Sequence, residues 1–121
     1  MLPPHWPGHW IYHITTAIAW EAAQPVGQYI HPSLETEGFI HCSYPDQVIE
    51  TARVHFQGQS GLVLLCIDPN QLQAELKAEV SRNGAAFPHL YGALNAAAVV
   101  ETVPFAPPPL ETVLEALLAR P

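Results

Sequence analysis

Short apolar runs separated by turn residues predict about five strands along this chain. The run at residues 61–67 carries no polar side chain, which is typical of a central strand covered on both faces. The other runs are rich in β-branched and aromatic residues or alternate between apolar and polar positions, and they cover residues 10–14, 39–42, 76–80 and 99–103. Residues 28–34 are expected to be irregular and residues 35–38 to form a turn. Mixed with two or three helices, these strands predict a single compact α+β domain.

Cap residues and helical spacing predict two helices within this domain. Thr15 or Thr16 is expected to cap a helix that runs through Gln24. Ser43 is expected to cap a second helix, with Asp46 in the position where Glu or Gln would complete a capping box. The buried stripe of the second helix has the spacing of one helix face and consists of Val48, Ile49, Ala52 and Phe56.

Proline content divides the chain into a central domain and two flanking segments. Residues 1–9 hold three prolines and are expected to form an irregular arm. Residues 10–105 form the predicted α+β domain, and residues 106–121 contain a proline linker, which begins near residue 104, and a C-terminal amphipathic helix. The apolar stripe of that helix consists of Leu110, Val113, Leu114, Leu117 and Leu118.

Charge and composition narrow the classes of function. The chain has 121 residues, of which 49% are hydrophobic, and a net charge of −7, so one domain with a real core is expected. Its cationic side chains are scattered and consist of Arg53, Lys77, Arg82 and Arg120. Because nucleic-acid binders cluster Lys and Arg against phosphates, non-specific nucleic-acid binding is not expected. A small ligand with one or two phosphates is still allowed, because backbone N–H groups can hold phosphate.

Apolar patterning and cysteine usage predict a cytoplasmic protein of bacterial style. No run of eighteen apolar residues is present, so no membrane association is expected. Residues 1–6 lack a basic segment followed by an apolar stretch, which argues against a secretory signal. Cys42 and Cys66 both lie in apolar runs and are expected to be buried, reduced thiols.

Histidine is the expected chemical group of this protein, because seven histidines outnumber the other cations. His13 lies in a predicted strand, either as a structural residue bonded to a carbonyl or as a partner of a ligand hydroxyl. His41 lies at a strand end beside Ser43, where a capped helix N-terminus could also receive an anion. His89 precedes Tyr91 in an aromatic segment that either packs on the sheet or walls a pocket.

Two carboxylates and one lysine are further candidates for the site. Glu79 belongs to a predicted strand, and Glu37 to the predicted turn before His41. The ordinary interpretation of both is a solvated surface carboxylate, and that of Lys77 is a surface lysine. The sequence does not decide which of the two glutamates is functional.

A metal site is the alternative to hydrogen bonding by these histidines. His13, His41, Cys42 and His89 could supply nitrogen and sulfur ligands. The chain contains no C-x-x-C, H-x-H or H-E-x-x-H motif, and His41 and Cys42 point to opposite faces of an extended segment. No metal is therefore expected.

The motifs of this chain resemble the DUF952 family, which consists of small, mostly bacterial, uncharacterised proteins. The resemblance covers about residues 10–103 and rests on six segments: 11–15, 33–34, 37–43, 62–65, 67–68 and 87–92, together with Trp20 and Gln47. Its most specific parts are the blocks Gly-Phe-Ile-His-Cys-Ser at 38–43 and Phe-Pro-His-Leu-Tyr-Gly at 87–92.

A more distant resemblance, to the ADP-ribosyltransferase-like fold and its RNA 2′-phosphotransferase branch, implies a split sheet with a pocket for NAD or a related nucleotide. The matching positions are an early strand histidine at His13, a strand end with His41 and Ser43, and the apolar strand at 62–68. The resemblance implies that His13 bonds ribose hydroxyls and that His41 and Ser43 orient the ribose or a phosphate. The arginines of that branch are missing here, with Lys77 near the place where one is expected.

The same resemblance implies that Glu79 is the catalytic carboxylate, with His13 and His41 as the other catalytic residues. His89 and Tyr91 would wall the pocket. The implied activity is binding of NAD or an ADP-ribose-like nucleotide, with transfer of ADP-ribose or cleavage of the nicotinamide bond as the chemistry. The alternatives are a non-catalytic small-ligand sensor and a histidine metal-binding protein.

Overall fold

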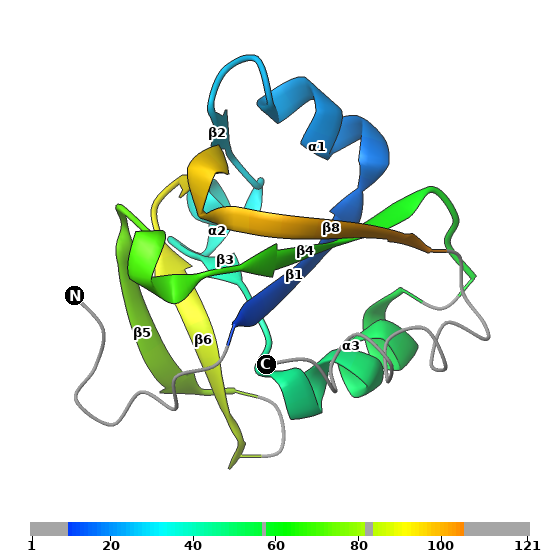
Figure 1. Ribbon diagram of the computed structural model, residues 1–121. Coiled ribbons are helices and arrows are strands. Elements are labelled where there is room, and N and C mark those ends of the chain that lie inside the picture. Colours follow the sequence, from blue (N-terminus) through cyan, green and yellow to red (C-terminus); the bar gives the residue numbers. More distant parts are fainter. Residues whose placement is uncertain (1–9, 57, 82–83, 106–121) are drawn as a thin grey trace.

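The computed structural model describes residues 10–56, 58–81 and 84–105, which form an α+β fold (Figure 1). The first sheet consists of β1 (Ile11–Thr16), β4 (Leu62–Ile67) and β8 (Val99–Phe105). Both strand pairs are antiparallel and the order is β1-β4-β8, so β4 is central. The prediction of a central strand from the unbroken apolar run is therefore confirmed.

A second three-stranded sheet carries most of the candidate residues. It has the order β3-β6-β5, from β3 (Ile40–His41), β6 (Ala86–Tyr91) and β5 (Glu75–Val80). A small third sheet pairs β2 (Gln28–Tyr29) with β7 (Leu94–Asn95). The chain after β3 joins the first sheet at an isolated bridge, where Tyr12 and Ser43 exchange N–H···O bonds of 2.9 and 2.8 Å.

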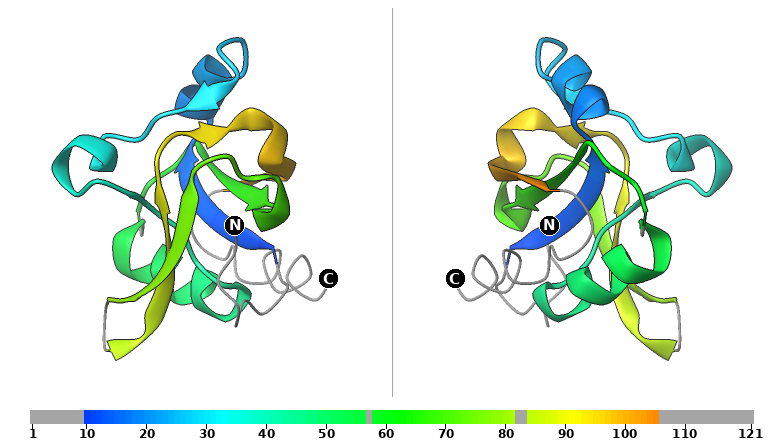
Figure 2. Two further views of the ribbon diagram at one scale, coloured as in Figure 1. Left: turned by 90° about the vertical axis from the view of Figure 1, so that its left-hand side faces the viewer. Right: turned by 90° about the vertical axis from the view of Figure 1, so that its right-hand side faces the viewer.

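In the part of the chain that the structure describes, α-helices and short 3-10 helices connect these strands. The α-helices are α1 (Ala17–Ala23), α2 (Ser33–Thr36) and α3 (Val48–His55), and the 3-10 helices are η1 (Pro45–Gln47), η2 (Pro69–Gln71) and η4 (Ala96–Ala98). Thr16 caps α1, because its Oγ1 accepts the N–H of Ala19 at 3.1 Å. Two opposite views, each turned by 90° from Figure 1, place α1 and α3 at opposite ends of the domain, with the β5–β6 hairpin extending beside α3 (Figure 2). Among the described residues, no helix has the length and apolar character needed to span a bilayer.

The alternation of β4 supplies two hydrophobic cores. Val63, Leu65 and Ile67 pack with α1 and with the inner face of the β3-β6-β5 sheet. Leu62, Leu64 and Cys66 pack on the other side against residues of β1 and α3. Every side chain of β4 is buried, so this strand is enclosed on both faces. The expected burial of Cys42 and Cys66 is confirmed, and neither forms a disulfide.

The predicted cap of the helix after β3 is wrong. Tyr44, not Ser43, precedes η1, and its N–H donates to Oε1 of Gln47 at 2.9 Å. Gln47 therefore occupies the position that the sequence had suggested for Asp46. The physical reason is the bridge to Tyr12, which holds the Ser43 backbone in the ladder and leaves its hydroxyl to pair with Thr51.

Three other boundaries differ from the sequence pattern. Residues 28–29 form β2 because they pair with β7, which is distant in sequence. Ser33–Thr36 is a short helix rather than the irregular segment and turn expected there. Residues 104–105 continue β8 instead of opening a linker. The predicted arm at 1–9 and the C-terminal helix lie outside the described residues.

Candidate functional site

A cavity of about 340 Å³ lies between β1, the segment after β3, and α3. Its polar lining includes His13, His31 and His41 with the hydroxyls of Ser43 and Thr51. Its apolar lining includes Val48 and Phe56 of the α3 region and Phe87 of β6. This size and mixture of surfaces are typical of small-molecule sites.

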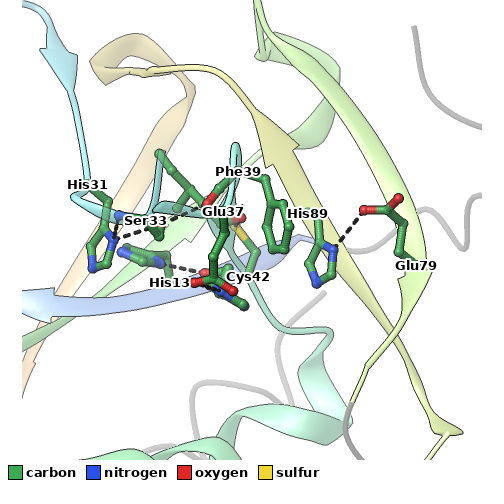
Figure 3. A network of polar contacts seen from close by, with 10 residues as sticks. His13, His31, Ser33, Glu37, Phe39, Cys42, Glu79 and His89 are labelled. Atoms are coloured by element: carbon green, nitrogen blue, oxygen red, sulfur yellow. Dashed lines mark hydrogen bonds and ion pairs between the residues drawn. The ribbon is translucent and has the colours of Figure 1, made fainter. Parts of the chain in front are cut away.

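His13 of β1 is buried and fully hydrogen-bonded. Its Nδ1 donates to the carbonyl oxygen of His41 at 2.6 Å, which fixes the proton on that nitrogen (Figure 3). Its Nε2 lies 3.0 Å from the Tyr29 hydroxyl, which donates to Oγ1 of Thr15 at 2.8 Å. Burial lowers the pKa of His13 from 6.5 to about 4, so the ring is neutral at pH 7.

His31 is held by the start of α2. The backbone N–H of Ser33 donates to Nδ1 of His31 at 3.0 Å, and the Ser33 hydroxyl lies 2.8 Å from the same nitrogen. Ser33 also donates through its hydroxyl to the Phe39 carbonyl at 2.7 Å. His31, α2 and the approach to β3 therefore form one bonded unit (Figure 3). Burial is the main cause that lowers the pKa of His31.

His41 and Glu37 form an exposed pair at the rim of this unit. Nε2 of His41 lies 2.9 Å from Oε2 of Glu37, and both side chains are about half exposed. The hydrogen bond from His41 lowers the pKa of Glu37, with smaller contributions from the charges of His41, His89 and His31. Glu37 is therefore an ionised carboxylate in the field of three histidines.

His89 of β6 is a second histidine paired with a carboxylate. It lies opposite His41 in the β3–β6 register, and the two ring centroids are 5.4 Å apart. Its Nδ1 donates to Oε1 of Glu79 at 2.9 Å, and the Tyr91 hydroxyl donates to the same oxygen. The hydrogen bond from Tyr91 is the largest cause that lowers the pKa of the Glu79 carboxyl, and the bond from His89 is the next.

The Nε2 atom of His89 is a buried nitrogen without a hydrogen-bond partner among the described residues. The side chain is only 4% exposed, because Phe39 stacks on the ring with a centroid distance of 4.0 Å. In Figure 3 this nitrogen faces away from Glu79. A buried polar atom in this state is a candidate contact for a ligand or a water molecule.

The structure places the predicted site residues in two groups. The β5–β6 register places Lys77 opposite His89 and Glu79 opposite Phe87. Lys77 extends over the Tyr91 ring, with Nζ 4.6 Å from the centroid. His13, His41 and Ser43 line the cavity, whereas Lys77, Glu79, His89 and Tyr91 are not among its lining residues.

Sequence reasoning missed four residues that hold this arrangement together: Tyr29, His31, Ser33 and Phe39. A histidine two residues before a serine, separated by proline, is a local signal that could have pointed to His31. Tyr29 carried no such signal, because its bonds to His13 and Thr15 span a distance in sequence that only the fold closes. Among the described residues, no group of three or more His, Cys, Asp or Glu side chains is placed to hold a metal ion.

The sequence pattern of a family described as "Protein of unknown function (DUF952)" matches residues 14–102. The chain belongs to the DUF952 family. This DUF952 protein is similar to CC0527 of Caulobacter crescentus, whose crystal structure shares 36% sequence identity and has a TM-score of 0.79. That match covers 88% of this chain and 98% of CC0527.

Two further structures of CC0527 agree with this likeness. A crystal structure of a double mutant gives a TM-score of 0.79 at 35% identity, covering 88% of this chain and 98% of that chain. A solution NMR structure gives 0.75 at 36% identity, covering 86% and 95%. No curated protein matches this chain. The DUF952 assignment is therefore firm for sequence and fold, and it carries no activity.

Proposed function

We propose that this DUF952 protein binds NAD or an ADP-ribose-like nucleotide in the histidine-lined cavity, and that it transfers ADP-ribose or cleaves the nicotinamide bond. The observation that carries the proposal is the polar part of the cavity lining, which includes His13, His31 and His41 and the hydroxyls of Ser43 and Thr51. Imidazole nitrogens and hydroxyls are suitable hydrogen-bond partners for ribose. No metal has a part in the proposal.

The arrangement of the sheets supports this proposal. Two three-stranded sheets, β1-β4-β8 and β3-β6-β5, meet at the bridge between Tyr12 and Ser43. The cavity begins beside that bridge. A split sheet with its pocket at the junction is what the sequence resemblance to the ADP-ribosyltransferase-like fold implies.

The chemistry would be departure of nicotinamide from the ribose. The C1′–N bond breaks, its electron pair neutralises the pyridinium nitrogen, and positive charge develops on the sugar ring. Water, or the acceptor of the ADP-ribose, then forms a bond to C1′ and loses a proton. An ionised carboxylate near that ring would stabilise the charge. Glu37 and Glu79 are the two candidates, and hydrogen bonds lower the pKa of both.

The proposed roles of the histidines follow from their bonds. His41 and Ser43 would contact the ribose or a phosphate directly, because both line the cavity. Since both nitrogens of His13 are engaged, a ribose hydroxyl would reach Nε2 by replacing the Tyr29 hydroxyl. His89 and Tyr91 would position Glu79, and Lys77 would stand beyond them for a phosphate.

Calorimetric titration with NAD and ADP-ribose, paired with an assay of nicotinamide release, tests the proposal. We expect binding that His41→Ala abolishes. Of Glu37→Gln and Glu79→Gln, the variant of the working carboxylate should keep binding and lose nicotinamide release by about a hundredfold. The matched controls are Glu35→Gln in α2 and Glu75→Gln in β5. If the unmodified chain binds neither ligand, the proposal is wrong.

A specific observation favours the runner-up, a sensor that binds without turnover. Among the described residues that line the cavity there is no carboxylate, because Glu37 and Glu79 are both turned to their histidine partners. Binding of NAD without nicotinamide release in the unmodified chain would establish this alternative.

A further inference from the structure

We infer that the part of the ligand recognised by this cavity is the nucleoside, held by its sugar hydroxyls and its ring, and that the phosphates add little. This inference rests on the proposed function and names the substrate class of the same site. It is carried by the hydrogen-bond character that the fold gives to each histidine, by the apolar part of the cavity lining and by the carboxylate beside His41.

The partners of His31 and His41 decide what each ring offers to a ligand. Nδ1 of His31 accepts the backbone N–H of Ser33, so the neutral ring carries its proton on Nε2 and offers a donor. Nε2 of His41 donates to the ionised Glu37, so the neutral ring offers Nδ1 as an acceptor. A sugar hydroxyl, which both donates and accepts, satisfies either group, whereas a phosphate oxygen only accepts.

His89 adds a second acceptor behind His41. Its Nδ1 donates to Glu79, which leaves a lone pair on Nε2 of the neutral ring. This nitrogen is buried without a partner among the described residues, and its ring lies edge-on to that of His41 at 5.4 Å. His89 does not line the cavity, so a ligand hydroxyl would reach this nitrogen only by displacing the Phe39 ring that stacks on it. Two acceptors in succession favour a ligand with neighbouring hydroxyls.

The apolar part of the cavity lining suits the flat ring of a nucleoside base. It includes Ile14, Val48, Phe56 and Phe87. Aromatic and aliphatic side chains of this kind bind planar rings by dispersion and burial of apolar area. Phe87 lies two residues along β6 from His89, the strand partner of His41.

The charge at the rim disfavours a phosphate. Glu37 is ionised and is hydrogen-bonded to His41, which lines the cavity. The lining side chains that the structure describes are otherwise histidines, hydroxyls, a thiol and apolar groups. A phosphate placed at His41 would therefore meet a like charge, and we place the phosphates of NAD in solvent outside the cavity.

The test is a calorimetric titration of the full chain with nicotinamide riboside, its 2′-deoxy analogue, NAD and ADP-ribose at low and high salt. We expect nicotinamide riboside to bind within about threefold of NAD at high salt, where the attraction between its pyridinium charge and the acidic chain is screened. We expect the 2′-deoxy analogue to bind about tenfold more weakly, the change that loss of one hydrogen bond produces. His89→Gln should lower the affinity for nicotinamide riboside and the affinity for NAD by the same factor.

Opposite outcomes separate this inference from the proposed function. NAD binding that is more than about tenfold tighter than that of the riboside, or that falls steeply with salt, would show that the protein recognises the phosphates of NAD. If that preference is lost in Lys77→Met, Lys77 binds the phosphates, and the inference fails while the proposed function stands. Binding of none of the four ligands overturns both.

Discussion

At the scale of single residues, partners rather than residue type decide what each histidine does. His13 has both nitrogens engaged and is a neutral, buried positioning group. His89 has one nitrogen bonded to Glu79 and the other without a partner among the described residues. Histidine therefore has a structural role at position 13 in β1, whereas at position 89 in β6 one of its nitrogens is available for a ligand.

The lowered pKa of His13 predicts loss of stability in acid. The unfolded chain binds a proton near pH 6.5 and the folded chain only near 4, so stability falls as the pH drops through this window. Between pH 7 and about 5 we expect a loss of about 2 kcal/mol from this residue. Urea denaturation at a series of pH values measures it.

His13→Gln is the variant that tests this assignment. It should flatten the dependence of the unfolding free energy on pH, even though it lowers stability at pH 7. His55→Gln, at an exposed position of α3, is the matched control and should keep the full slope. A slope unchanged in His13→Gln would show that another group causes the acid sensitivity.

At the scale of elements, strand register assembles the site. β3 pairs with β6 so that His41 lies opposite His89, and β5 pairs with β6 so that Lys77 lies opposite the same residue. Since alternate residues share a face, Phe87, His89 and Tyr91 lie on the same side of β6. The opposite face of this sheet enters the core through Ile40, Leu76 and Leu90.

The turn after β6 depends on a glycine at position 92. Gly92 has φ +152°, and a Cβ added there would lie 2.8 Å from the Cβ of Ala74. Gly92→Ala should therefore lower the free energy of unfolding by about 1–3 kcal/mol, through both strain and overlap. Gly27→Ala is the control, because Gly27 has φ +84° but open space around it, so only backbone strain applies. Equal losses in the two variants would contradict the role of the Ala74 contact.

At the scale of the whole molecule, two cores are joined through β4. Cys42 belongs to the core that contains α1 and the inner face of the β3-β6-β5 sheet. Cys66 belongs to the core that contains β1 and α3 residues. The cavity lies where these two halves meet, beside the Tyr12–Ser43 bridge, so its shape depends on both.

Thiol labelling can report whether the two cores open together. Burial raises the pKa of Cys42 to about 12, and both thiols are buried, so neither should react with a thiol reagent in the native state. In Cys42→Ser and Cys66→Ser the remaining thiol should be labelled at the rate of global unfolding. Labelling of one thiol well before the other would show that one core opens independently.

Much of the element order follows from local pattern. The unbroken apolar run at 62–67 indicated a central strand, and Thr16 is the cap of α1 as the hydroxyl before an apolar helix suggests. The prediction of a cap at Ser43 was wrong, because a bridge to Tyr12, which is distant in sequence, holds Ser43 in the ladder. β2 and β7 escaped detection for the same reason, since each is only two residues long and exists through its partner.

The sequence by itself determined the α+β class, the family and the residue types of the site, because periodicity, caps and motifs are local properties of the chain. Only the tertiary structure decided that Glu37 pairs with His41, that Glu79 pairs with His89, and that Tyr29 completes the bonds of His13. The physical reason is that a histidine's tautomer, burial and free nitrogen are set by neighbours that strand pairing brings together across the fold.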